Sequence, residues 1–164
     1  MMKPLKKILL AEDDPNDVEL TLMALSRAHL ANEVDVVHNG AEALDYLFRR
    51  GAYAGRGNGD PAVVLLDIKM PKVDGLEVLR QIRADPELRL QPVVMLTSSG
   101  EESDLLRSYE LGVNAYVIKP VEFDDFVHAA TELGMFWAVI NEPPRRCNGQ
   151  TPVPVGSGEA TKGI

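Results

Sequence analysis

The sequence has a single cysteine, Cys147, no long hydrophobic run and no block of basic residues. One cysteine cannot form an intramolecular disulfide, so nothing requires an oxidising compartment. The basic stretch 1–7 is followed by only about four apolar residues, far short of a signal peptide or a membrane span. A net charge of −8 argues against binding to nucleic acid or to an anionic membrane. These absences favour a soluble, cytoplasmic protein whose partners are proteins or small ligands.

Further absences concern size and nucleotide chemistry. A chain of 164 residues can form one domain with a modest extension, so a separate output domain is not expected. The glycine-containing stretch 51–61 lacks a Walker lysine pair and is interpreted as a flexible loop that includes Arg56. The three histidines lie in different predicted elements without metal-ligand spacing, and we interpret them as surface or packing residues: His29, His38 and His128.

Five short apolar runs alternate with five segments of helical spacing. The runs cover residues 8–11, 34–37, 63–67, 92–96 and 115–119. The first helix is predicted to begin with Asp14 as its N-cap and Pro15 at its first position. This alternation predicts an α/β fold, a doubly wound five-stranded parallel sheet with helices on both faces. In the flavodoxin-like strand order 2-1-3-4-5, the first and third strands are neighbours at the switch point.

Three of these runs end in charged residues. Residues 8–11 lead into Glu12 and Asp13, residues 63–66 into Asp67, and residues 116–118 into Lys119. The carboxyl ends of parallel strands share one edge of the sheet, where ligands of such folds bind. Converging carboxylates repel one another unless a cation lies among them, and a nearby lysine then favours an added anion. The pattern indicates a Mg²⁺-dependent phosphoryl site.

Four motifs carry a family resemblance. They are Leu10-Ala11-Glu12-Asp13, Leu66-Asp67-Ile68-Lys69-Met70-Pro71-Lys72-Val73-Asp74-Gly75, Met95-Leu96-Thr97-Ser98 and Tyr116-Val117-Ile118-Lys119-Pro120. In this order, within about residues 6–134, they closely resemble the receiver domains of two-component response regulators. The glycine-rich loop and the Phe-Trp and Asn-Glu-Pro-Pro pattern after Gly134 resemble the stand-alone regulators associated with bacterial phytochromes.

The resemblance implies a role for each acidic residue. Asp67 would be the phosphoacceptor, and Asp13, Asp67 and the backbone carbonyl of Lys69 would bind Mg²⁺. Glu12 would act through a bound water. Taken alone, Asp67 could instead be a turn-forming aspartate, and Glu12 with Asp13 a solvated helix entry. Lys69 departs from the family pattern, and a side chain leaning over the pocket would alter the access of water or of the donor and so change the phosphate lifetime.

The resemblance also implies roles for residues at the fourth and fifth strands. Thr97 would donate its hydroxyl to the phosphoryl group, and Lys119 would pair with a phosphoryl oxygen. Pro120 would follow Lys119 through a cis peptide bond. Tyr116 would be the aromatic switch residue that moves together with Thr97, although a strand aromatic packed on a helix is equally compatible with its position.

The chain divides into a receiver domain (1–134), an apolar carboxyl-terminal arm (135–147) and a tail (148–164) expected to be disordered. Gly134 could interrupt the helix that precedes the arm, and prolines must end it. The apolar cluster of the arm would be a liability in water, so it packs on the chain's own core or, as we favour, contacts a second copy in a homodimer. Its residues are Met135, Phe136, Trp137, Val139, Ile140, Pro143 and Pro144.

The sequence therefore predicts a stand-alone response regulator rather than a metabolic enzyme. A sensor histidine kinase, with a phytochrome as one candidate, would phosphorylate Asp67. The signal would pass through partner binding, dimerisation or phosphorelay to a histidine phosphotransfer protein. One alternative is a Mg²⁺-dependent phosphohydrolase with an aspartyl nucleophile, although the chain lacks a second aspartate two residues after Asp67 and a cap insertion. The other alternative is an interaction module that works without phosphorylation.

Overall fold

The computed structural model describes residues 6–30, 33–57 and 59–144. Its strands form one parallel sheet in the order β2-β1-β3-β4-β5, which confirms the predicted fold. The strands are β1 (Ile8–Ala11), β2 (Val34–Val37), β3 (Val63–Leu66), β4 (Val93–Thr97) and β5 (Ala115–Ile118). No helix among the described residues is long and apolar enough to span a membrane.

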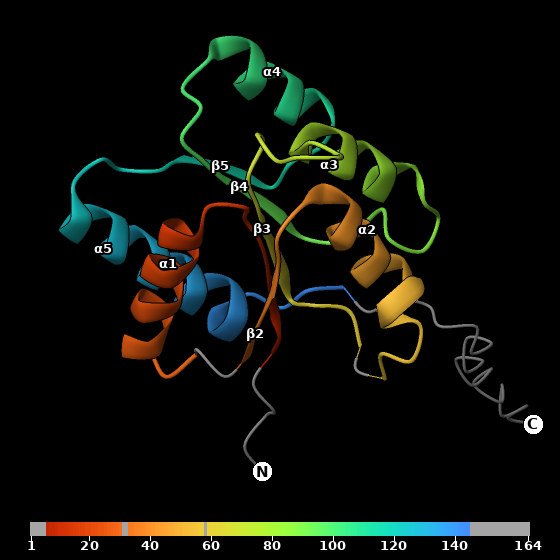
Figure 1. The fold of residues 1–164 in the computed structure, drawn as a ribbon, viewed down its shortest axis with the longest axis horizontal. Coiled ribbons are helices and arrows are strands. Elements are labelled where there is room, and N and C mark those ends of the chain that lie inside the picture. The colour runs from red at the N-terminus through yellow and green to blue at the C-terminus, as the bar shows by residue number, and fades with distance from the viewer. Residues whose placement is uncertain (1–5, 31–32, 58, 145–164) are drawn as a thin grey trace, which may run out of the picture.

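Helices cover both faces of this sheet (Figure 1). On one side lie α1 (Pro15–Arg27) and α5 (Phe123–Gly134), and on the other α2 (Gly40–Phe48), α3 (Gly75–Ala84) and α4 (Glu102–Glu110). Side chains alternate along each strand, so β1 serves both layers. Leu9 packs in the cluster that includes α2 and α3, whereas Ile8 packs in the cluster that includes Leu25 of α1. Burial on both faces explains why the central strands are apolar throughout.

The strand register aligns the carboxyl ends at one edge. Ala11 is paired with Leu66, and Thr97 with Ile118. The predicted strand boundaries differ by one residue, because β3 and β5 end just before Asp67 and Lys119, and β4 begins and ends one residue later. The amide of Asp67 still donates to the Ala11 carbonyl at 3.1 Å, and that of Lys119 to the Thr97 carbonyl at 2.7 Å. These bonds hold the backbone of both charged residues at the sheet edge.

Gly134 does not interrupt the last helix, which is a correction to the sequence prediction. Its backbone is helical, with φ −60° and ψ −47°, and a wider π-helical turn, η3 (Met135–Ile140), continues from α5. A Cβ atom at this position would lie 2.2 Å from Leu25 Cδ2. The glycine therefore lets α5 approach α1 closely. The helix ends before Asn141, two residues ahead of the prolines.

One face of the arm packs on the chain's own core. Ala138 is buried in the cluster with Ile8 and Leu25, and Trp137 packs against it. Lys6 Nζ donates to the Asn141 carbonyl at 2.6 Å and holds the end of η3. The other face is exposed by 39–67% and consists of Met135, Phe136, Val139 and Ile140. Pro143 is half-buried and Pro144 is exposed, while residues 145–147 and the predicted tail 148–164 lie outside the described residues.

The glycine-rich loop is held by Arg56. Its guanidinium lies 4.1 Å from the centre of the Tyr46 ring, and its Nε donates to the Tyr46 carbonyl at 3.1 Å. Nη1 donates to the Gly59 carbonyl at 3.1 Å, and the Tyr46 hydroxyl donates to Asp35 at 2.5 Å. Arg56 thus ties the described part of this loop to α2, which the glycine content alone does not indicate.

Candidate functional site

Three carboxylates from two strand ends meet at the sheet edge. Glu12 and Asp13 follow β1, Asp67 follows β3, and one oxygen from each lies within 4.8 Å of the others. Glu12 and Asp67 are buried, whereas Asp13 is exposed to solvent. This spacing allows the three side chains to share one hydrated ion, and an all-oxygen donor set suits a hard divalent cation. The structure thus brings together the three acids named from the sequence.

Lys119 crosses to this cluster from the end of β5. Its Nζ donates to Glu12 Oε2 in a short contact, to Asp17 Oδ2 at 2.9 Å and to Asp67 Oδ2 at 3.2 Å. The Lys119 side chain is only 6% exposed. Burial alone would lower its pKa, but the hydrogen bonds to Glu12 and Asp17 and the charge of Asp67 outweigh burial and raise it. The ammonium therefore stays charged and offsets part of the negative charge of the cluster.

Glu12 has a perturbed carboxyl group. Burial raises its pKa to about 7, and the charge of Asp67 acts in the same direction, against the hydrogen bond from Lys119. Its Oε1 also accepts from the Asp14 amide at 3.0 Å. Glu12 thus takes up a proton more readily than an exposed carboxyl group would, because burial disfavours its charged form.

The predicted cis bond before Pro120 is wrong. Among the described residues no peptide bond is cis, so Lys119 and Pro120 are joined in the trans form. The trans isomer is favoured by about 0.5–1 kcal/mol for ordinary proline bonds. Lys119 reaches Asp67 from this trans backbone, so its amine needs no cis bond to enter the site.

Asp17 is the residue of this site that the sequence analysis missed. It lies in the first turn of α1, where an acid is also favoured by the helix dipole. Its carboxylate contacts Lys119 more closely than Asp67 does. A signal was present, because Asp17 lies in the first turn of the helix that directly follows Glu12 and Asp13.

The backbone around Asp67 is closely packed. Asp67 Oδ1 accepts from the amide of Ile68 at 2.7 Å, which fixes the carboxylate orientation. Gly75, the first residue of α3, donates its amide to the Ile68 carbonyl at 2.7 Å. A Cβ atom on Gly75 would lie 2.1 Å from the Asp67 carbonyl oxygen. Only glycine therefore allows α3 to begin directly against the predicted phosphoacceptor.

The two predicted switch residues meet through Ser99. Thr97 is fully buried, and its Oγ1 accepts from the Ser99 amide at 3.2 Å. The Tyr116 hydroxyl donates to the Ser99 carbonyl at 2.9 Å, and its ring packs against the core beside α2 and α3. Ser99 Oγ donates to Asp104 of α4 at 2.6 Å. Movement of Thr97 would thus be felt by both Tyr116 and α4.

Lys69 points toward α4. Its Nζ lies 3.8 Å from Glu101 Oε1, and both side chains are more than half exposed. The predicted role of its backbone carbonyl as a metal ligand stays a prediction. An exposed pair of this kind contributes little to stability.

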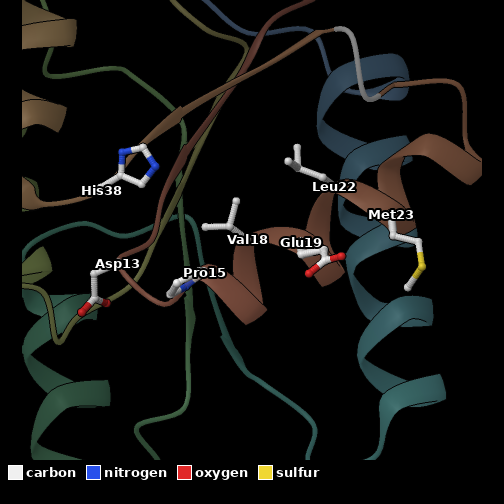
Figure 2. A pocket seen from close by; sticks show the side chains of 7 residues that line it. All are labelled: Asp13, Pro15, Val18, Glu19, Leu22, Met23 and His38. Carbon is white, nitrogen blue, oxygen red and sulfur yellow. The ribbon is translucent and has the colours of Figure 1, made fainter.

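A hollow of about 500 Å³ adjoins the acidic cluster through Asp13, and Figure 2 shows the side chains that line it. Its lining is mainly apolar, and most of the lining residues belong to α1. The lining consists of Asp13, Pro15, Val18, Glu19, Leu22, Met23 and His38. Asp13 belongs to both the hollow and the cluster.

The three histidines lie outside this cluster. His38 lies 3.5 Å from Glu42, His128 lies 3.1 Å from Glu132, and His29 is exposed. None of the three joins the acidic cluster identified among the described residues.

Comparison with known proteins agrees with this geometry. The family model described as the response regulator receiver domain matches residues 8–131. The bacteriophytochrome response regulator RtBRR is 65% identical, with a TM-score of 0.68, and the match covers 86% of this chain and 85% of that one.

Two further solved structures are similar to the chain. The phosphorylated cyanobacterial phytochrome response regulator RcpA has a TM-score of 0.80 at 38% identity, and the match covers 86% of this chain and 99% of that one. The Mn²⁺-bound form of response regulator Rcp1 has a TM-score of 0.78 at 35% identity, with coverage of 85% and 99%. The similarity thus extends over nearly the whole length of these regulators.

Proposed function

The chain belongs to the response regulator receiver family of two-component signalling, and we propose that it is a stand-alone cytoplasmic regulator phosphorylated on Asp67. The observation that carries this proposal is the meeting of Glu12, Asp13 and Asp67 within 4.8 Å, with the Lys119 ammonium among them. A carboxylate cluster beside a charged lysine is suited to a reaction that adds negative charge at one of its members.

In the proposed reaction, an Asp67 carboxylate oxygen attacks the phosphorus of a donor. An O–P bond forms, the bond from phosphorus to the donor's imidazole nitrogen or carboxylate oxygen breaks, and the donor leaves with that electron pair. Lys119 and the Thr97 hydroxyl then contact phosphoryl oxygens. The proposed cation is Mg²⁺, bound by Asp13, Asp67 and the Lys69 carbonyl, with Glu12 acting through a water. When bound, it offsets the charge of the phosphoryl group.

The residues present fit such a cation. The donor set consists of oxygens, and the excess of carboxylates over lysine leaves the cluster short of positive charge. Rcp1, a similar regulator, has a Mn²⁺-bound form, which supports binding of a divalent cation by this chain. Phosphorylation of the related RcpA likewise supports the proposed modification.

Intact mass spectrometry tests the proposal. The full chain is incubated with acetyl phosphate, with and without Mg²⁺, beside Asp67→Asn as the control. The expected result is one phosphoryl adduct that requires Mg²⁺ and is absent in Asp67→Asn. No adduct on the wild-type chain would contradict the proposal.

The same samples separate the alternatives. We propose that the chain is not a metabolic enzyme, so it should not release phosphate over many turnovers from small phosphate monoesters such as p-nitrophenyl phosphate. Sustained release that depends on Asp67 would favour the phosphohydrolase. A full adduct that alters neither oligomeric state nor partner binding would favour the interaction module.

We also propose that the hollow beside Asp13 receives the phosphodonor protein, a histidine kinase. A phosphohistidine can reach Asp67 only if its carrier covers the surface next to the cluster, and the hollow adjoins it through Asp13. The apolar side chains of Val18 and Leu22 in its lining suit contact with another protein. The relatives named for phytochromes support a bacteriophytochrome kinase as the donor.

Comparing a large donor with a small one tests this surface. Leu22→Glu should slow phosphotransfer from a purified bacteriophytochrome kinase at least tenfold, because a charge would be buried under the partner. Phosphorylation by acetyl phosphate should be unchanged, since a small donor needs no docking. Leu106→Glu, on the exposed part of α4, is the matched control. Equal slowing with both donors would contradict the assignment.

The third proposal is that the exposed face of η3 forms a homodimer contact. Met135, Phe136, Val139 and Ile140 share one side of the helix and stay exposed while Trp137 and Ala138 pack inward. An apolar face of this kind is typical of a self-association surface. In multi-angle light scattering, Phe136→Asp should shift the full chain toward the monomer, and Leu106→Glu should not. A wild-type monomer at high micromolar concentration would refute the contact.

A further inference from the structure

Asp17 holds Lys119 from outside the acidic cluster. Three carboxylates contact the ammonium among the described residues, but only Glu12 and Asp67 also belong to the group that could share a cation. Asp17 comes from α1, and its Oδ2 lies 2.9 Å from Nζ, compared with 3.2 Å for Asp67. Its side chain is 27% exposed, so the contact is partly shielded from water.

The three contacts use the full donor capacity of Lys119. An ammonium has three N–H donors, and here they go to Glu12, Asp17 and Asp67. The contact with Asp67 is the longest of the three, and its acceptor is the carboxylate that would become phosphorylated. That N–H can pass to a phosphoryl oxygen while the contacts to Glu12 and Asp17 stay in place.

A cation in the cluster would compete with Lys119 for Glu12 and Asp67 but not for Asp17. The Asp17 contact therefore does not depend on whether the cluster is loaded. Lys119 has a flexible four-carbon chain that loses considerable rotamer freedom when its amine is fixed. The contact with Asp17 on α1 would restrict the rotamers of Lys119 before the donor binds, so this entropy would not have to be lost during the reaction.

We propose that Asp17 is a positioning residue, which fixes the Lys119 ammonium so that one N–H faces the phosphoryl group arriving at Asp67. This inference rests on the proposed function of Asp67. Asp17 would then take part in the reaction without contacting the cation or the donor. Its place in the first turn of α1 would otherwise be explained by the helix dipole alone.

The test compares Asp17→Asn with Asp124→Asn. Each change removes one negative charge from the first turn of a helix, but Asp124 lies on α5, is exposed, and is not among the three carboxylates that contact Lys119. With acetyl phosphate and saturating Mg²⁺, Asp17→Asn should lower the maximal phosphorylation rate roughly tenfold. The donor concentration at half-maximal rate should stay unchanged, because Asp17 does not contact the donor. Asp124→Asn should keep the wild-type rate, and Asp17→Glu, which retains the charge, should recover part of it.

Two further measurements separate positioning from a merely structural role. In a Lys119→Met background, Asp17→Asn should have no additional effect on the rate. In the metal-free chain, the NMR signal of the Lys119 ammonium should shift in Asp17→Asn and not in Asp124→Asn. A wild-type rate in Asp17→Asn, an equal loss in Asp124→Asn, or a full additional loss without Lys119 would overturn the inference. A wild-type chain that gains no phosphoryl group would overturn the proposed function and this inference together.

Discussion

Replacing Gly75 with alanine should destabilise the protein at the point where α3 meets the phosphoacceptor loop. The new Cβ would lie 2.1 Å from the Asp67 carbonyl oxygen and 2.9 Å from Ile68 Cα. Both obstacles are backbone atoms, so relief requires α3 or the loop to move by roughly 1 Å to restore normal contact. That movement would also stretch the 2.7 Å bond from the Gly75 amide to the Ile68 carbonyl.

The size of the effect follows from three contributions. Overpacking costs about 1–3 kcal/mol, and loss of the hydrogen bond costs about 1 kcal/mol. Reduced entropy of the unfolded chain returns about 0.4–1 kcal/mol. The free energy of unfolding should therefore fall by about 1–3.5 kcal/mol, which lowers Tm by roughly 2–14 °C.

Thermal denaturation followed by circular dichroism measures this change. Gly100→Ala is the matched control, because the nearest atom to its new Cβ would be Ile118 Cδ1 at 3.9 Å, an ordinary contact. It should alter the free energy of unfolding by no more than about 0.5 kcal/mol. An unchanged Tm for Gly75→Ala would refute the reasoning, since it would mean that α3 can withdraw from Asp67 without cost.

Three further predictions follow from contacts elsewhere in the fold. Arg83 donates hydrogen bonds to the carbonyls of Gly112, Arg89 and Gln91 and to Asn114 Oδ1, and Arg83→Met would leave these acceptors without that donor. The free energy of unfolding measured in urea titrations should therefore fall by about 2–4 kcal/mol. Gly134→Ala should lower Tm by several degrees despite better helix propensity, because its Cβ would meet Leu25 Cδ2 at 2.2 Å. Because burial raises the pKa of Glu12 to about 7, a cation binding below that pH must expel a proton. Mn²⁺ affinity measured by calorimetry should therefore rise between about pH 6 and about pH 8, and less steeply in Glu12→Gln.

The sequence was sufficient to predict the sheet and the meeting of the main charged groups. Glu12, Asp13, Asp67 and Lys119 each follow an apolar run, and parallel strands necessarily bring such positions to one edge. The predicted cis bond before Pro120 failed, because local sequence does not decide the isomer of a proline bond.

Contacts that depend on how helices are rotated could not be predicted. Asp17 and Lys119 are 102 positions apart, and their contact requires the exact placement of α1 against the end of β5. Gly134 has a role only because Leu25 of α1 lies opposite it. The division of the arm into a packed and an exposed face likewise depends on the path of α5, although the apolar content of the arm was evident.

The contacts of Arg56 with Tyr46 and Gly59, here called the Arg56 clamp, should slow proteolysis of the glycine-rich loop. The Arg56 side chain is 9% exposed and lies against Tyr46. Trypsin must draw an arginine side chain into its own specificity pocket, so the bond after Arg56 is protected while the clamp holds. Cleavage there would proceed only as fast as the loop detaches from α2. Limited digestion of the native chain would thus measure the rate at which this loop detaches from α2.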